Sequence, residues 1–112
     1  MKQNKPSPLL IIILAAGRGK RMNSDIPKVL HEINGTTMLD KVLETSLLLQ
    51  PYKIIVVTGH KSDMVEESTK KYVLDGFPLE FENQREQKGT AHAVMQCMKH
   101  LKTFDGDVLV LC

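Results

Sequence analysis

Four short segments with the sequence character of strands, separated by segments of helical periodicity, constrain the fold of this chain more than any other feature. The four strand-like segments lie at residues 9–14, 54–57, 79–83 and 108–111. Three of them are continuously apolar, which is typical of strands buried on both faces, whereas 79–83 alternates with two glutamates and favours one wetter face. Strands that alternate with helices form right-handed crossovers. The sequence therefore predicts an α/β fold, a Rossmann-like and mostly parallel sheet with helices on both faces.

Three helices are expected between these strands, because apolar residues recur there three or four positions apart. The first begins at Leu39 and is stopped by Pro51, the second begins at about Ser62 and ends before Gly76, and the third opens at Gly89. Ser62 or Asp63 is the expected cap of the second helix. The side chains expected to be buried are Val42, Leu43 and Leu47 in the first helix, Val65, Ser68 and Tyr72 in the second, and Ala91, Val94, Met95, Met98 and Leu101 in the third. Residues 15–34 are expected to be mainly loop, with a turn at Asn34-Gly35.

The composition is that of an ordinary globular domain. The chain has 112 residues, 42% hydrophobic and 25% charged, so residues 1–112 are expected to form one domain. The net charge of +2 predicts no nucleic-acid or membrane partner. Cys97 and Cys112 are too few for a disulfide framework, and both are expected to be buried in a reducing cytosol. The expected location is cytoplasmic.

The alternative is that the chain is secreted and that its N-terminal segment is a signal peptide. Lys2 and Lys5 precede the apolar run 9–16, as in a signal peptide. Pro6 and Pro8 interrupt the approach to that run, which is short for a signal core. A β-branched run that leads into a glycine loop favours a buried strand instead.

The loop that follows the first strand has the composition of an anion site. Small residues at 15–17 and 19 let the backbone approach a ligand closely, and successive N–H groups can form a concave anion site. Four cations follow that would neutralise phosphate oxygens, namely Arg18, Lys20, Arg21 and Lys28. A dinucleotide-binding loop requires glycine where Met22 stands, and no Walker A motif is present. The alternative is a solvated basic turn.

A specific resemblance favours the phosphate site over the basic turn. Residues 14–22 and the following Pro27-Lys28-Val29-Leu30-His31 resemble the signature of sugar-phosphate nucleotidyltransferases, which share the nucleotide-diphospho-sugar transferase type of fold. The Pro-Lys-Val-Leu-His continuation is similar to that of the bacterial N-acetylglucosamine-1-phosphate uridyltransferases. Two further segments match in the same order, at 57–60 and 84–93. Lys20 departs from the pattern, because the family often has Ser or Thr there.

The resemblance implies a role for each matching position. The backbone of Leu14, Ala15, Ala16 and Gly17 would line the uracil and ribose pocket; Gly19, Arg21 and Lys28 would hold the triphosphate, with Arg18 close by; and Gln84, Gln87, Gly89 and Thr90 would complete the recognition of uracil. Arg21 and Lys28 are the implied catalytic residues, since they would stabilise charge on the departing pyrophosphate. Uracil presents two carbonyl acceptors beside one N–H donor, which suits amide side chains and backbone N–H groups. The alternative is that Gln84 and Gln87 are ordinary surface residues.

The implied reaction joins UTP and N-acetylglucosamine 1-phosphate to give UDP-N-acetylglucosamine, a cell-wall precursor, and pyrophosphate. The implied cofactor is Mg²⁺, whose expected aspartate ligand would follow Cys112, so the chain is expected to be the N-terminal part of a truncated domain and inactive alone. The four histidines share no metal-ligand spacing. Alternatives are a nucleotidyltransferase for another sugar phosphate or base, and a non-catalytic nucleotide-binding fragment. The sequence does not determine the oligomeric state.

Overall fold

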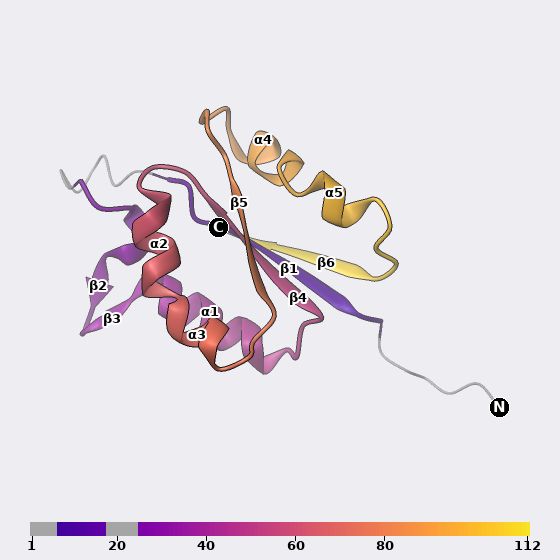
Figure 1. Ribbon diagram of the computed structural model, residues 1–112, viewed down its shortest axis with the longest axis horizontal. Helices are drawn as coiled ribbons and strands as arrows, with labels where there is room; N and C mark the ends of the chain where they lie inside the picture. The colour runs from indigo at the N-terminus through magenta and orange to yellow at the C-terminus, as the bar shows by residue number, and fades with distance from the viewer. Residues whose placement is uncertain (1–6, 18–24) are drawn as a thin grey trace.

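A four-stranded parallel sheet forms the centre of the computed structural model, which describes residues 7–17 and 25–112 (Figure 1). Its strands are β1 (Leu9–Leu14), β4 (Lys53–Thr58), β5 (Leu79–Asn83) and β6 (Asp107–Leu111). They are arranged in the order β5-β4-β1-β6, and all three pairings are parallel. The two central strands are therefore the first two of the sheet in sequence. The predicted α/β fold is confirmed.

Helices cover both faces of this sheet (Figure 1). One face carries α1 (Met38–Leu48), α2 (Ser62–Ser68) and α3 (Lys70–Leu74), and the other carries α4 (Thr90–Met95) and α5 (Met98–Leu101). Successive side chains of a strand point to opposite faces, so β1 and β4 supply both cores. The side chains of these strands under α1 to α3 are Ile11, Ile13, Ile54 and Val56, and those under α4 and α5 are Leu10, Ile12, Ile55 and Val57.

The segment between β1 and α1 is more ordered than its composition predicts. A 3-10 helix (Lys28–Leu30) is followed by two antiparallel two-residue strands, β2 (Glu32–Ile33) and β3 (Thr36–Thr37). The predicted turn joins them, with φ angles of 55° at Asn34 and 81° at Gly35. Thr37 then caps α1, because its Oγ1 accepts a hydrogen bond from the Asp40 N–H at 3.0 Å. Two-residue strands are too short to produce a periodic signal.

The second predicted helix is divided at Thr69. This residue ends α2 and precedes α3, and its buried hydroxyl donates to the Val65 carbonyl at 3.1 Å. A threonine that bonds back into the preceding turn competes with regular helix geometry. The predicted side-chain cap is wrong, because the N-cap is Lys61 in the left-handed region (φ 52°) with no side-chain cap bond. Val65 and Tyr72 are buried as expected.

The inner face predicted for the third helix is partly wrong. Met95 and Met98 are 62% and 45% exposed, and Ala91 is also exposed. The buried side chains are instead Ala93 and Cys97. Ala93, Cys97 and Leu101 follow one another at intervals of four residues, so they share one helical face. Val94 and Leu101 pack against this core as predicted.

Strand β6 is not the buried strand that its apolar sequence predicts. Val108 and Val110 are 45% and 38% exposed, because β6 lies at an edge of the sheet. Cys112, which was expected to be buried with Cys97, is exposed. In the part of the chain that the structure describes, no helix is both long and apolar enough to cross a bilayer.

Candidate functional site

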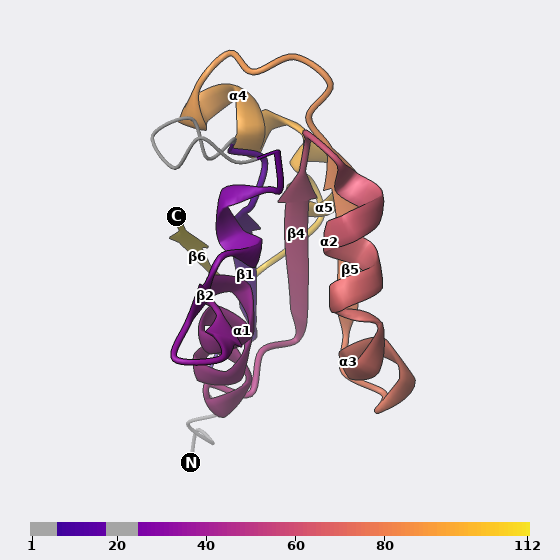
Figure 2. The same ribbon diagram turned by 90° about the vertical axis from the view of Figure 1, so that its left-hand side faces the viewer.

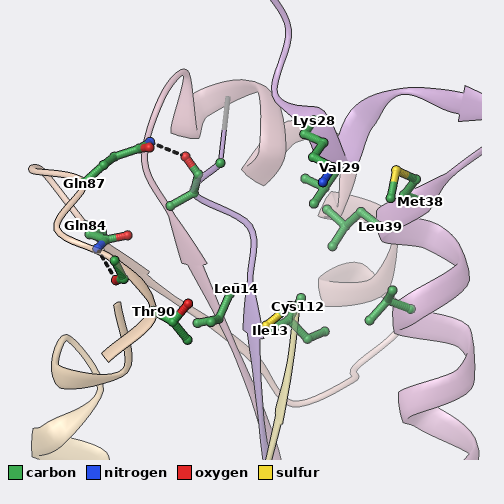
Figure 3. Close-up of a pocket in the computed structure, with 14 residues that line it drawn as sticks. Ile13, Leu14, Lys28, Val29, Met38, Leu39, Gln84, Gln87, Thr90 and Cys112 are labelled. Atoms are coloured by element: carbon green, nitrogen blue, oxygen red, sulfur yellow. Dashed lines mark hydrogen bonds between the residues drawn. The ribbon is translucent and has the colours of Figure 1, made fainter. Parts of the chain in front are cut away.

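A cavity of about 320 Å³ lies where the carboxyl end of β1 meets the loop that follows β5 (Figure 3). Segments far apart in sequence form its walls. Eight of the twelve residues that the resemblance implicates line it, namely Leu14, Ala16, Gly17, Lys28, Gln84, Gln87, Gly89 and Thr90. In open parallel sheets ligands bind beyond the carboxyl ends of the strands, and this cavity has that position.

The first wall is the loop that leaves β1. The Ala15 N–H donates to the Val57 carbonyl at 2.8 Å, which continues the pairing of β1 with β4 by one residue. This bond turns the Ala15 side chain into the core, where it is 1% exposed, so Ala15 lies beside the cavity and does not line it. Gly59 packs against the same loop, since a Cβ there would lie 2.9 Å from the Ala16 Cβ. The absence of a side chain at 59 thus lets the two loops approach.

The second wall is the loop between β5 and α4, which passes over the sheet in Figure 2. The Gln84 N–H donates to the Thr58 carbonyl at 2.7 Å, and Gln84 is only 4% exposed, so it is not an ordinary surface residue. Its Nε2 donates to the Gly89 carbonyl at 3.2 Å. Gln87 Nε2 donates to the Ala16 carbonyl and so joins the two walls. Gly89 has a φ of 95°, a conformation that a side chain would strain.

The third wall begins at Lys28, on the opposite side of the cavity from Gln84 and Gln87 (Figure 3). Lys28 begins the 3-10 helix, and its N–H donates to the Gly17 carbonyl at 3.3 Å, which ties this wall to the first one. No carboxylate in residues 7–17 and 25–112 forms an ion pair with Lys28. Its ammonium group is therefore available to an anionic ligand.

Three implicated residues, Arg18, Gly19 and Arg21, lie outside the described residues, as does Lys20. The cavity also has an apolar side that sequence reasoning missed. Its members are Ile13, Val29, Met38, Leu39, Val42 and Cys112. Those on α1 have the helical spacing of a core face, and that periodicity does not distinguish side chains under a sheet from side chains at the mouth of a cavity.

Two of the histidines take part in structural contacts. His60 Nε2 lies 3.0 Å from the Asp25 carbonyl oxygen, and His100 Nε2 lies 2.7 Å from a Glu82 carboxylate oxygen. Burial raises the pKa of Glu82, but hydrogen bonds from His100 and Lys99 outweigh that effect, so its pKa lies below the usual value. The hydrogen bond from Lys61 likewise lowers the pKa of Asp25.

The described residues do not fit a magnesium site. Among them no three His, Cys, Asp or Glu side chains cluster, and no described carboxylate lines the cavity. Mg²⁺ requires oxygen ligands, usually one or two of them carboxylates. The chemistry available in this cavity is therefore that of a cation, hydrogen-bonding amides and an apolar surface.

Comparison with known proteins identifies the family of the chain. The MobA-like NTP transferase domain family matches residues 11–112. The chain belongs to that family. The bifunctional protein GlmU of Gloeothece citriformis is 43% identical to this NTP transferase domain over 101 residues, which are 90% of this chain and 22% of that protein. GlmU of Bordetella parapertussis is 49% identical over 100 residues, 88% of this chain and 21% of that protein.

The NTP transferase domain thus spans about a fifth of the length of these curated relatives. A solved structure, HddC from Yersinia pseudotuberculosis complexed with GMP-PN, is 26% identical and superimposes with a TM-score of 0.73. That match covers 90% of this chain and 46% of HddC. The predicted resemblance to the bacterial uridyltransferases and the predicted nucleotidyltransferase fold are both confirmed.

Proposed function

We propose that this chain provides the nucleotide-binding part of a cytoplasmic enzyme that joins UTP and N-acetylglucosamine 1-phosphate to give UDP-N-acetylglucosamine and pyrophosphate, a step in cell-wall precursor synthesis. The observation that carries the proposal is the convergence of residues from 14–17, 28 and 84–90 on one cavity. These are the segments whose sequence resembles the uridyltransferases. The similarity to proteins named GlmU supports the same assignment.

The second wall suits a pyrimidine base. A flat base lies closely against backbone only where no side chain intervenes, and Gly89 provides such a place. Gln84 and the backbone of the walls supply hydrogen-bonding groups for the polar edge of uracil. A purine would meet the backbone near Gly89, so UTP is expected to be preferred over ATP and GTP.

The third wall suits the phosphates. In the proposed reaction an oxygen of the sugar phosphate attacks the α-phosphorus of UTP in line, and the bond from that phosphorus to the pyrophosphate oxygen breaks. UTP and the sugar phosphate bring four phosphate groups together, so the protein mainly positions and neutralises them. Lys28 is the described cation of the cavity, and Arg21 is proposed to act with it. This displacement requires no protein nucleophile.

Calorimetric titration of the purified chain with UTP and with uridine tests the proposal. Lys28→Ala is expected to weaken UTP binding about tenfold or more and uridine binding little, because it removes one charge-assisted contact to phosphate. Lys41→Ala is the matched control, since Lys41 is an exposed cation of α1 that does not line the cavity. Equal effects of the two substitutions would contradict the phosphate assignment.

The titration also includes GTP and ATP, because HddC was solved with the guanine nucleotide analogue GMP-PN. If the unsubstituted chain binds GTP more tightly than UTP, a nucleotidyltransferase for another base is favoured. Binding without turnover by the longer parent protein would favour a non-catalytic module.

Thiol labelling gives a second, independent test of the cavity. Cys112 lines the cavity and is exposed, whereas Cys97 is buried. Burial, followed by the nearby Glu82 charge, raises the pKa of Cys97 to about 11, which keeps that thiol unreactive at neutral pH. We expect UTP to slow alkylation of Cys112 and to leave Cys97 unlabelled throughout. Labelling of Cys112 at the same rate with and without saturating UTP would place the nucleotide elsewhere.

A further inference from the structure

The Gln84 side chain is held by two partners that leave one of its polar atoms free. Its Nε2 lies 3.2 Å from the Gly89 carbonyl oxygen and 2.9 Å from His92 Nδ1. Gln84 Oε1 has no hydrogen-bond partner among the described residues, and it points toward the cavity in Figure 3. The carboxamide therefore presents an acceptor to whatever the cavity binds.

The carbonyl of Gly89 decides which end of the carboxamide lies at this position. One atom of Gln84 contacts both Gly89 O and His92 Nδ1, and a carbonyl oxygen can only accept. That atom must therefore be the amide nitrogen. Gly89 O also accepts the Ala93 N–H at 3.1 Å, the first bond of α4, so the helix fixes its direction.

The orientation of Gln84 also determines which ring nitrogen of His92 is the acceptor. Both hydrogens of the amide nitrogen are used, one on Gly89 O and one on His92 Nδ1. Nδ1 must then be the unprotonated acceptor of a neutral imidazole. His92 stands on the first turn of α4, where Gln96 Nε2 donates to the His92 carbonyl at 3.0 Å. With Nδ1 as the acceptor, His92 Nε2 carries the ring hydrogen, so its 3.4 Å contact with the Gln96 amide nitrogen is not a hydrogen bond.

We infer that His92 is a positioning residue that makes the cavity select uracil over cytosine; this inference rests on the proposed function. By accepting from Gln84 Nε2, His92 keeps Oε1 directed into the cavity. An acceptor there matches the N3–H donor of uracil and opposes the N3 lone pair of cytosine. A carboxamide turned by 180° would present its NH₂ group and favour cytosine. His92 does not touch the base, because it does not line the cavity.

Calorimetric titration of the 112-residue chain with UTP and with CTP tests this inference. His92→Ala and His92→Leu remove the acceptor, and we expect the UTP-over-CTP affinity ratio to fall about two- to tenfold, the effect of one neutral hydrogen bond. His92→Asn restores an amide oxygen near the position of Nδ1 and is expected to keep most of the parental ratio. Met95→Ala, an exposed position on the same helix, is the matched control. Circular dichroism establishes that each variant is folded.

The possible outcomes separate this inference from the proposed function. A parental ratio in His92→Ala, or an Asn variant that loses selectivity as fully as the Ala variant, would overturn the role of the acceptor. A parent chain that binds UTP and CTP equally would overturn the inference and leave nucleotide binding intact. A parent chain that binds neither nucleotide would overturn the proposed function and the inference together.

Discussion

Strands β1 and β6 are neighbours in one sheet and have similarly apolar sequences, but they differ in burial and in the elements that surround them. Ile12 of β1 pairs with Val110 of β6, yet Ile12 is fully buried and Val110 is 38% exposed. β1 has a hydrogen-bonded strand on each side and helices on both faces, whereas β6 has one neighbouring strand. The difference teaches that the position of a strand in the sheet, more than its own hydrophobicity, determines how much of it is buried.

The largest expected effect comes from truncating the two paired residues. Ile12→Ala removes a fully buried side chain and is expected to lower the free energy of unfolding by about 2–5 kcal/mol. Val110→Ala is expected to cost less than about 1 kcal/mol, because its environment is already partly solvent. Urea denaturation followed by circular dichroism measures both losses. Similar losses at the two positions would mean that β6 is covered in solution and would break the comparison.

The next effect concerns how the carboxyl end of β1 is held beside the cavity. Gly59→Ala would place a Cβ 2.9 Å from the Ala16 Cβ and 3.1 Å from the Ala16 carbonyl oxygen. The backbone must then move, and we expect a loss of about 1–3 kcal/mol in the free energy of unfolding. Gly17→Ala is the matched control, because a Cβ at Gly17 meets no atom of the described residues within 4 Å. Thermal melts compare the two variants, and an equally stable Gly59→Ala would argue against close packing of these loops.

A smaller effect is expected at β5, the opposite edge of the sheet. The pKa of Glu82 is lowered overall, so its charged form stabilises the fold above the ordinary value of 4.5, and this contribution is lost as pH falls through the lower folded-state pKa. Glu82→Gln removes the titrating group, so the free energy of unfolding of this variant is expected to fall by about 1 kcal/mol less than that of the unsubstituted chain as the pH is lowered. The control is Glu80→Gln, whose side chain is 48% exposed in its pair with Lys53. Chemical denaturation between pH 3 and pH 7 measures the profiles, which should differ only for Glu82.

The smallest effect on stability is expected from charging the exposed surface of β6. Val108→Lys should change the free energy of unfolding by no more than about 0.5 kcal/mol, since Val108 is 45% exposed. A lysine on an open edge strand should nevertheless reduce self-association, because it opposes pairing with a second chain. Sedimentation velocity measures that reduction. Leu48→Lys, at an 82% exposed position of α1, controls for the loss of apolar surface elsewhere. If Leu48→Lys reduces self-association equally, the chains do not associate through the edge of β6.

The sequence by itself predicted the strands of the parallel sheet, the helical segments between them and the motif. Continuous apolar runs at 9–14 and 54–57, and the spacing of Leu39 and Leu43, indicate strands and a helix through local geometry alone. The motif segments at 14–17, 28 and 84–90 were identified before any contact between them was known, and the structure places eight of the twelve implicated residues around one cavity.

Tertiary structure decided what depends on neighbours. Nothing in the sequence of residues 108–111 indicates that β6 lies at an edge. Hydrophobic periodicity predicts that a segment is a strand, but it does not predict how many strands lie beside it. The packed fold also decided which helical face of α4 and α5 lies on the sheet, so that Ala93 and Cys97 are buried and Met95 and Met98 are exposed. The orientation of Gln84 depends on Gly89 and His92, which α4 brings to its side. Local propensity fixes which elements form, and only the packed fold fixes which groups are left free to bind.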